Sequence, residues 1–194
     1  NWTNGFLPAQ HQGVVMRSLG VAIDDLAIPR GISKTQETAT RKLLNQLNEN
    51  LNSRQGDDNN LTARVKSYEL AARMQRVVPE ITDLGKENQT THELYGVGNG
   101  EANDFARSCL LTRRLLEHGV RFVQLFSGGA FQSPRINWDG HENCKKNHLR
   151  EAARIDQPIT GFIKDLRQRG MLDDTVILFT SEFGRTPFAE SAED

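Results

Sequence analysis

The sequence has few of the residues that mark special classes of protein. It contains only two cysteines, Cys109 and Cys144, in 194 residues. Two cysteines are too few for a disulfide-stapled fold, and their spacing does not favour a bridge between them. No apolar run approaches the roughly 20 residues that a membrane-spanning helix requires, so no membrane span is expected.

An excess of charge of either sign is also lacking. Lysine and arginine together number 24, aspartate and glutamate number 25, and the formal net charge is −1. Such a chain has no global field that would draw it to nucleic acid or to an acidic membrane surface. No nucleic-acid partner is therefore expected, and a small or sugar-like substrate fits the composition better.

Length and apolar content indicate a single α/β domain. A chain of 194 residues with 37% hydrophobic residues is long enough to bury the core of one such domain, although two small domains remain possible. The chain starts at Asn1 and stops in polar sequence at Asp194, so both ends are expected to continue in a longer protein.

The first half of the chain predicts a loop and then two helices. The first thirty residues are rich in glycine and proline, which is typical of an ordered loop. A capping-box pattern at Ser33–Gln36 is followed by leucines at helical spacing up to Gly56. Asn60 begins a second amphipathic pattern that should end near Pro79. We expect a helical hairpin at residues 33–78, inserted beside a sheet.

After a polar linker at 83–100, apolar residues again recur at helical spacing. They predict a helix from Phe105 to the His118-Gly119 pair, where glycine is a typical helix terminator. Residues 120–126 follow directly and are rich in branched and aromatic side chains, which favours a strand buried on both faces.

The same alternation continues toward the end of the chain. Helical spacing returns at 149–166, with a kink or restart expected at Pro158. Residues 175–180 form the most strand-like run of the sequence. Strand, loop, helix and strand in this order predict a core of largely parallel sheet over residues 101–187, flanked by helices.

Polar side chains follow both expected strands. Asp139 and His141 lie in the loop after the first strand, and Glu182 and Arg185 come directly after the second. The carboxyl ends of parallel strands meet at one edge of a sheet, which is where open α/β sheets bind ligands. We therefore expect these four side chains to share one site.

The chemistry of these side chains suits a metal site. Carboxylate and imidazole ligands bind zinc, manganese or iron while leaving positions open for substrate. Asp139 and His141 can hold one ion from a single turn, and Glu182 can hold the same ion or a neighbouring one. Arg185 offers a planar fork for the oxygens of a phosphate or sulfate. The metal would polarise the ester and neutralise the charge on its leaving group.

Several stretches carry a resemblance to a known family. They are Gly-Val-Arg-Phe-Val-Gln-Leu at 119–125, Trp-Asp-Gly-His at 138–141, and the run at 173–187 that ends in Ser-Glu-Phe-Gly-Arg-Thr-Pro. Together with residues 1–13 they resemble DUF1501, a bacterial sulfatase-like family catalogued as a domain of unknown function. That family is similar to the alkaline phosphatase superfamily, which includes sulfatases and phosphodiesterases.

The resemblance implies a site with two divalent ions, such as Zn, Mn or Ca, and a periplasmic or exported location. Asp139 and His141 match the pair that binds one ion in the superfamily. Glu182 and Phe183 stand where an Asp-His pair commonly binds the second ion. Glutamate can replace aspartate as an oxygen ligand, but Phe183 cannot bind a metal, so the second site is expected to be weakened or rebuilt. The superfamily's nucleophile and late histidine have no counterpart in this sequence.

The sequence thus predicts part of an alkaline phosphatase-like domain that hydrolyses sulfate or phosphate esters of small molecules or polysaccharides. Asp139, His141 and Glu182 would bind metal, and Arg185 would bind the anion. Two alternatives remain open. One is a binding or structural protein that has lost part of the metal site, and the other is a metal-dependent phosphotransferase or isomerase on the same fold.

The remaining polar residues are interpreted as structural. Cys144 and His148 have a spacing that could hold a metal at the start of a helix, but as a lone pair they are taken as structural or exposed. His118 is placed where a cation suits the helix dipole, and Trp138 is taken to pack under the metal loop. Three arginines are interpreted as a solvated face: Arg113, Arg114 and Arg121.

Overall fold

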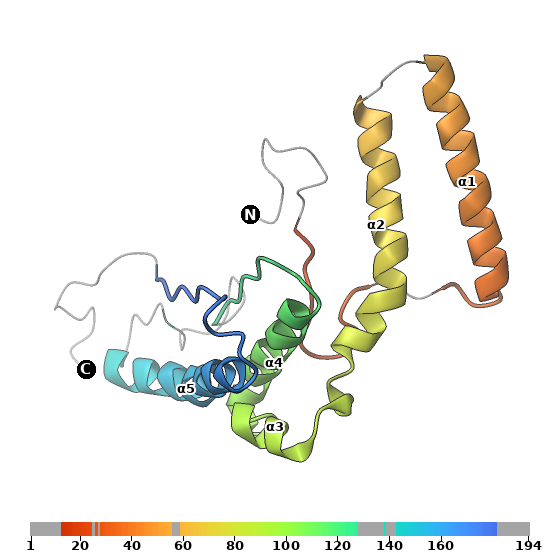
Figure 1. The fold of residues 1–194 in the computed structure, drawn as a ribbon. Helices are drawn as coiled ribbons and strands as arrows, with labels where there is room; N and C mark the ends of the chain where they lie inside the picture. Colours follow the sequence, from red (N-terminus) through yellow and green to blue (C-terminus); the bar gives the residue numbers. More distant parts are fainter. Residues whose placement is uncertain are drawn as a thin grey trace. The chain divides into compact units, whose positions relative to one another are not determined.

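The computed structural model describes residues 13–24, 26, 28–55, 59–127, 138 and 143–181. The regular structure in these ranges is helical (Figure 1). The chain divides into two compact units, Asn1–Asp83 and Leu84–Asp194. None of the helices in the described ranges combines the length and the apolar character needed to cross a bilayer.

The first unit contains α1 (Lys34–Gln55) and α2 (Asn59–Thr82), two antiparallel helices that contact each other. The predicted capping box is present at the start of α1. The Ser33 amide donates to Gln36 Oε1 at 2.9 Å, and the Gln36 amide donates to Ser33 Oγ at 3.2 Å. These bonds satisfy two backbone donors that a helix start otherwise leaves unpaired. The capping pattern therefore identified this helix start correctly.

The prediction that α2 ends near Pro79 is wrong, because the helix continues to Thr82. Proline has no amide hydrogen, so at this position it removes one helical hydrogen bond. Val78 and Ile81, in the same turn, are buried. Burial of these side chains offsets the loss of a single bond close to the helix end.

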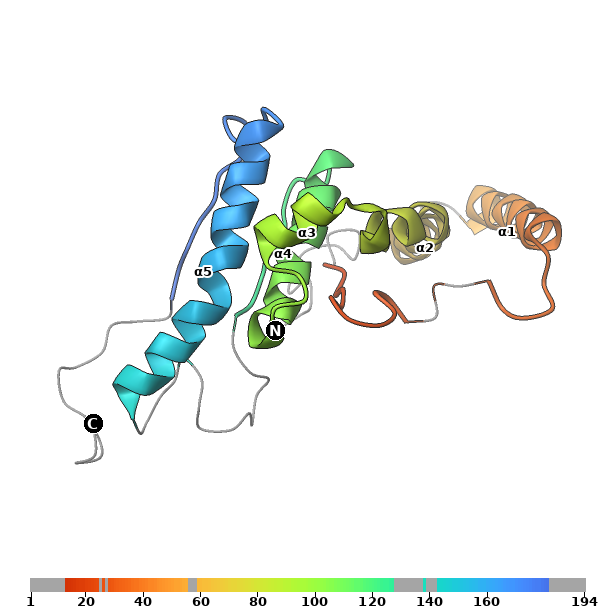
Figure 2. The same cartoon turned by 90° about the horizontal axis from the view of Figure 1, so that it is seen from below.

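The second unit is a group of packed helices. Two short 3-10 helices, η2 (Leu84–Lys86) and η3 (Gly100–Ala102), flank α3 (Gln89–Tyr95). The two long helices are α4 (Asn103–Glu117) and α5 (Cys144–Gln168). Helices α4 and α5 pack together, and α3 contacts both of them (Figure 2).

The core of this unit lies where α3, α4 and α5 meet. Its fully buried apolar side chains include one from α3, three from α4 and one from α5: Tyr95, Ala106, Cys109, Leu110 and Leu166. Gly161 allows α5 to approach α3 closely, since a Cβ at this position would lie 2.5 Å from the carbonyl oxygen of Leu94. A larger residue at position 161 would therefore push the two helices apart.

Helix α3 lies in the stretch expected to be a polar linker. Asn88 caps it, accepting a hydrogen bond from the Thr91 amide at 2.8 Å, and Gly96 ends it with a left-handed φ of 76°. Both residues are ordinary helix boundary signals. The helix between them has seven residues, which is too short for a clear apolar periodicity to show in the sequence.

The long helices of the second unit agree better with the sequence. Helix α4 ends at the predicted place, with His118 as its cap and Gly119 at φ 82°. Helix α5 begins at Cys144 and passes through Pro158 as one continuous helix, so the restart predicted as one of two outcomes is wrong. Pro158 is buried on the same face as Ile155 and Phe162. The packing of this face offsets the one hydrogen bond that proline removes.

The predicted α/β fold, with an alkaline phosphatase-like parallel sheet, is wrong for the described part of the chain. Residues 120–126 and 175–180 are not paired as strands there, although both carry the expected composition. Their apolar side chains lie in solvent, with Phe122 82%, Val176 95% and Leu178 82% exposed. A strand requires hydrogen bonds to a neighbouring strand, so strand-like composition is not sufficient to form a sheet.

Candidate functional site

The four predicted site residues, Asp139, His141, Glu182 and Arg185, lie outside the described residues. Their convergence in one site stays a prediction. The structure describes chain on both sides of the first motif, at Trp138 and Asn143, and it describes the chain before the second motif up to residue 181.

Helix α5 links the two motifs. After the helix, residues 171–181 run back beside it toward its N-terminal end (Figures 1 and 2). Helix α5 has 25 residues and spans about 37 Å at a rise of roughly 1.5 Å per residue. Residues 171–175 contain a turn, and the six residues after it cover about 20 Å at roughly 3.3 Å each. By residue 181 the chain therefore runs part of the way back along α5, toward the end at which the first motif enters.

A small cluster of side chains marks that end of α5. The Cys144 sulfur lies 3.3 Å from Nδ1 of His148, one helical turn later. The His148 ring centroid is 5.9 Å from that of Trp138, with the two planes tilted by 49°. Trp138 in turn donates from Nε1 to Ser127 Oγ at 3.1 Å. Trp138, the residue directly before Asp139, therefore lies against the first turns of α5.

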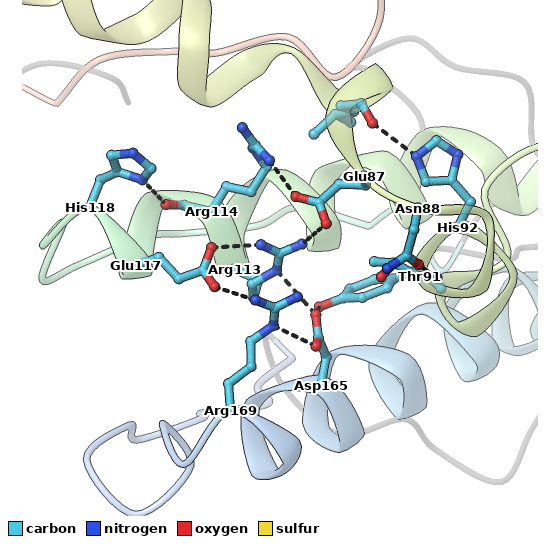
Figure 3. Close-up of polar contacts among 12 residues, drawn as sticks. Glu87, Asn88, Thr91, His92, Arg113, Arg114, Glu117, His118, Asp165 and Arg169 are labelled. Atoms are coloured by element: carbon cyan, nitrogen blue, oxygen red, sulfur yellow. Dashed lines mark hydrogen bonds and ion pairs between the residues drawn. The ribbon is translucent and has the colours of Figure 1, made fainter.

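A second cluster of polar side chains lies near the other end of α5 (Figure 3). We call it the ion cluster, and it consists of six charged residues: Glu87, Arg113, Arg114, Glu117, Asp165 and Arg169. Asp165 stands 17 positions after His148 on the helix, which corresponds to about 26 Å. The ion cluster is therefore separate from the Cys144–His148 pair.

Arg113 lies at the centre of the ion cluster and is only 1% exposed. Each of its three guanidinium nitrogens faces a carboxylate: Nη2 lies 2.6 Å from Glu87, Nη1 lies 2.6 Å from Glu117, and Nε lies 3.1 Å from Asp165. Nη2 and Nε reach ion-pair distance without the alignment of a hydrogen bond. Electrostatic attraction therefore dominates these two contacts.

Further contacts balance the charge of the ion cluster. Arg114 pairs with Glu87, and Arg169 binds both Asp165 and Glu117 at 2.7 Å. Three guanidinium groups thus face three carboxylates. A buried charge is costly unless it is paired, and here each charge has a partner of opposite sign.

Two pKa shifts follow from this environment. Burial alone would raise the pKa of Glu87. The guanidinium groups of Arg113 and Arg114 lower it by a larger amount, so the pKa of the carboxyl lies below its usual value. Burial and the neighbouring Asp165 carboxylate raise the pKa of Tyr95 well above its usual range. The Tyr95 phenol therefore stays protonated, and its hydroxyl donates a hydrogen bond to Asp165 Oδ2 at 2.9 Å.

The ion cluster joins the elements of the second unit. Glu87 stands between η2 and α3, Arg113 lies on α4, and Asp165 lies on α5. Because its guanidinium groups already pair with carboxylates, the cluster holds these elements together and does not offer a charge to a ligand. We interpret it as the structural centre of the unit.

The sequence analysis did not identify the ion cluster. Arg113 and Arg114 were interpreted as part of a solvated face, which is wrong because both are buried, whereas Arg121 is exposed as expected. One signal was available: Arg113 and Glu117 are four residues apart, a spacing that pairs opposite charges on a helix. The other two carboxylates that compensate the burial of Arg113, those of Glu87 and Asp165, come from distant positions in the sequence.

Comparisons with known proteins complete the description. No curated protein and no solved structure matches the chain. The model of a family described as a protein of unknown function, DUF1501, matches residues 1–193. The wider similarity to sulfatases stays a prediction. Because the match covers almost every residue of the sequence, the chain belongs to the DUF1501 family.

Proposed function

We propose that this protein is a metal-dependent hydrolase of sulfate or phosphate esters. Asp139, His141 and Glu182 would be its metal ligands, and Arg185 would bind the anionic group of the substrate. The observation that carries the proposal is the concentration of these residue types in two short motifs on either side of α5. Carboxylates and imidazole bind divalent cations, and guanidinium is the best partner for a tetrahedral oxyanion.

The course of the chain around α5 supports this proposal. The first motif precedes the helix, and the second follows the segment that runs back beside it. Both motifs are thereby attached to one helix, the first at its N-terminal end and the second through a segment that turns back along it. Such an attachment favours a shared site, because catalytic groups must be held in a fixed relative geometry.

Each proposed ligand would have a separate part in the reaction. Metal ions held by Asp139, His141 and Glu182 would supply Lewis-acid polarisation of the ester oxygen. Arg185 would hold two oxygens of the sulfate or phosphate through its planar fork. Charge that develops on these oxygens during cleavage would then meet a positive group already in position.

Hydrolysis of aryl sulfates and aryl phosphates by the purified protein tests this proposal. Asp139→Ala and Glu182→Ala should each reduce kcat/KM by more than about a hundredfold, since loss of even an outer-shell partner of a metal costs about ten- to a hundredfold. Asp173→Ala is the matched control, because Asp173 is exposed in the turn after α5 and should leave activity unchanged. Hydrolysis that survives both ligand substitutions would show the site assignment to be wrong.

The same preparation distinguishes the two alternatives. Metal analysis that finds stoichiometric ions in a protein without hydrolytic activity would favour phosphotransfer or isomerisation, which can be followed with an acceptor alcohol. A protein without bound metal and without activity would favour a binding or structural role. The presence of Phe183 at a position where the resemblance predicts a metal ligand supports this last alternative.

A further inference from the structure

Helix α1 carries an apolar face that α2 does not cover. The face consists of four leucines at helical spacing, and we call it the leucine face: Leu43, Leu44, Leu47 and Leu51. Their exposed fractions are 56%, 51%, 54% and 40%. A contiguous apolar surface of this kind marks an interaction site more often than single exposed apolar residues do.

The side of α1 that contacts α2 is polar instead. The half-buried residues in the described part of α1 are Glu37, Arg41, Asn45 and Asn48. Arg41 pairs with Glu37 and donates from Nη2 to Gln75 Oε1 on α2 at 3.1 Å. The hairpin is therefore joined along a polar seam, and the leucine face lies on its flank.

The leucine face carries no charged residue between positions 36 and 51. Gln36 and Thr40 continue it toward the start of α1, whereas Lys42 and Glu49 fall on the opposite side of the helix. Charged residues make up 25% of the chain, so this face is poor in charge compared with the rest of the protein. Depletion of charge is the compositional sign of the core of a protein interface.

The chemistry of α1 narrows the kind of partner. The outer side of a single helix is convex and lacks the concave shape that a small ligand requires. A helix that lies on a membrane has a polar face rich in lysine and arginine and an apolar face with aromatic residues. Helix α1 contains no aromatic residue, and its opposite side carries both signs of charge. A second helix with a similar apolar stripe fits this face best.

The spacing of the leucines makes the face complementary to itself. Leu43 and Leu51 each lie four positions from Leu47, so the pattern is the same when it is read in either direction. A two-fold axis at Leu47 places this residue against Leu47 of a second copy, and Leu43 against Leu51. Such an interface uses the same patch on both copies, as two-fold dimers do.

We propose that two copies of this chain associate through their leucine faces, with the two α1 helices antiparallel. The 22 residues of α1 span about 33 Å, and with the roughly 10 Å width of a helix the contact covers about 330 Å² per copy. Stable dimers bury roughly 800 Å² per partner. The dimer is therefore weak, and its population depends on protein concentration.

Sedimentation equilibrium of the full chain tests this association. Concentrations from about 1 to 100 μM cover the affinities expected of a small interface. We expect a mass that rises from one chain toward two over this range. Leu47→Glu places two carboxylates against each other at the two-fold axis and should weaken the dimer at least about tenfold.

Gln46→Glu is the matched control. It adds the same charge at the neighbouring exposed position, which lies off the leucine face, and should leave the dimer unchanged. Glutamate is a good helix former, so neither variant should lose α1. If circular dichroism nevertheless shows a loss of helix in Leu47→Glu, Leu47→Ala decides, and its dimer should again be weaker than that of the unmodified protein.

A mixture of two variants tests the register of the pair. Leu47→Glu and Leu47→Lys should each be monomeric alone, and together they should form a dimer, because opposite charges then meet at the axis. A mixture that stays monomeric overturns the contact between the two Leu47 positions. An unmodified protein that stays monomeric at every concentration, or a dimer that Leu47→Glu does not weaken, overturns the proposal. None of these outcomes depends on the proposed metal site.

Discussion

At the scale of single residues, Arg113 is the position on which the second unit depends most. Removing one partner from a group of buried charges leaves the others uncompensated, which typically costs about 3–5 kcal/mol. We expect Arg113→Met to lower the free energy of unfolding by about that amount, because Glu87, Glu117 and Asp165 would each lose a contact. Urea denaturation measures the change.

The control for this variant is Arg167→Met on the exposed face of α5. It removes the same side chain from a solvated position and should change stability by less than about 0.5 kcal/mol. Equal stabilities of the two variants would contradict the interpretation of the ion cluster as the structural centre of the unit.

Glu87 should make the stability of the protein sensitive to acid. Because its pKa in the folded state is lowered from the ordinary value of 4.5, the ionised carboxyl stabilises the fold. This contribution is complete above the unfolded pKa and is lost as the pH falls through the lower folded pKa. We expect Glu87→Gln to be destabilised at neutral pH, and the difference from the unmodified protein to shrink in acid.

Unfolding in urea at neutral pH and at a pH below 4.5 measures this change. Asp174→Asn, at an exposed turn position of the same unit, controls for the general effect of losing a carboxylate. A difference between Glu87→Gln and the unmodified protein that stays constant over this range would contradict the prediction.

The sequence could predict only those ion pairs of the cluster whose two residues lie on the same helix. The pairs Arg113 with Glu117 and Asp165 with Arg169 have helical spacing and can be read directly. Glu87 lies 26 positions before Arg113, so its part in the burial of the guanidinium depends on tertiary packing. The residue types of the proposed metal site are visible in sequence, whereas their relative placement is a property of the fold.

At the scale of elements, the contact between α3 and α5 depends on Gly161. In an exposed helix, alanine is about 1 kcal/mol better than glycine. Here the added Cβ would lie 2.5 Å from Leu94 O and 3.0 Å from Tyr95 Cα, which are backbone atoms that cannot rotate away. We expect Gly161→Ala to destabilise the protein by about 1–3 kcal/mol, the usual range for overpacking.

Thermal unfolding followed by circular dichroism measures this effect. Thr160→Ala, at the exposed neighbouring position of α5, should be neutral or slightly stabilising. A stabilised Gly161→Ala variant would show that the two helices are not in close contact.

The elements that could be predicted are those whose signals are local. The capping box at Ser33 and the glycine after α4 identify helix ends because the bonds involved join residues within one turn. The apolar runs at 120–126 and 175–180 were misassigned because strand pairing joins distant segments and composition does not reveal a partner. Helix α3 was missed since its seven residues show little periodicity.

At the scale of the whole molecule, the apolar segments 120–126 and 175–180 expose large side chains to solvent, and the second segment offers the clearer test. Val176 is 95% exposed and Leu178 is 82% exposed. Their replacement by serine should remove apolar surface without removing packing. We expect the double variant V176S/L178S to keep its free energy of unfolding within about 0.5 kcal/mol, as surface substitutions do. It should also bind less of a hydrophobic dye, because exposed apolar patches bind such probes.

Leu166→Ala provides the contrast, since Leu166 is completely buried on α5 and its truncation should cost about 2–5 kcal/mol. Urea denaturation and dye fluorescence of the three proteins give both quantities. If V176S/L178S loses as much stability as Leu166→Ala, the two side chains are buried in solution and the segment is packed against another part of the protein. If its stability is unchanged and its dye binding falls, the segment is a solvent-exposed apolar surface.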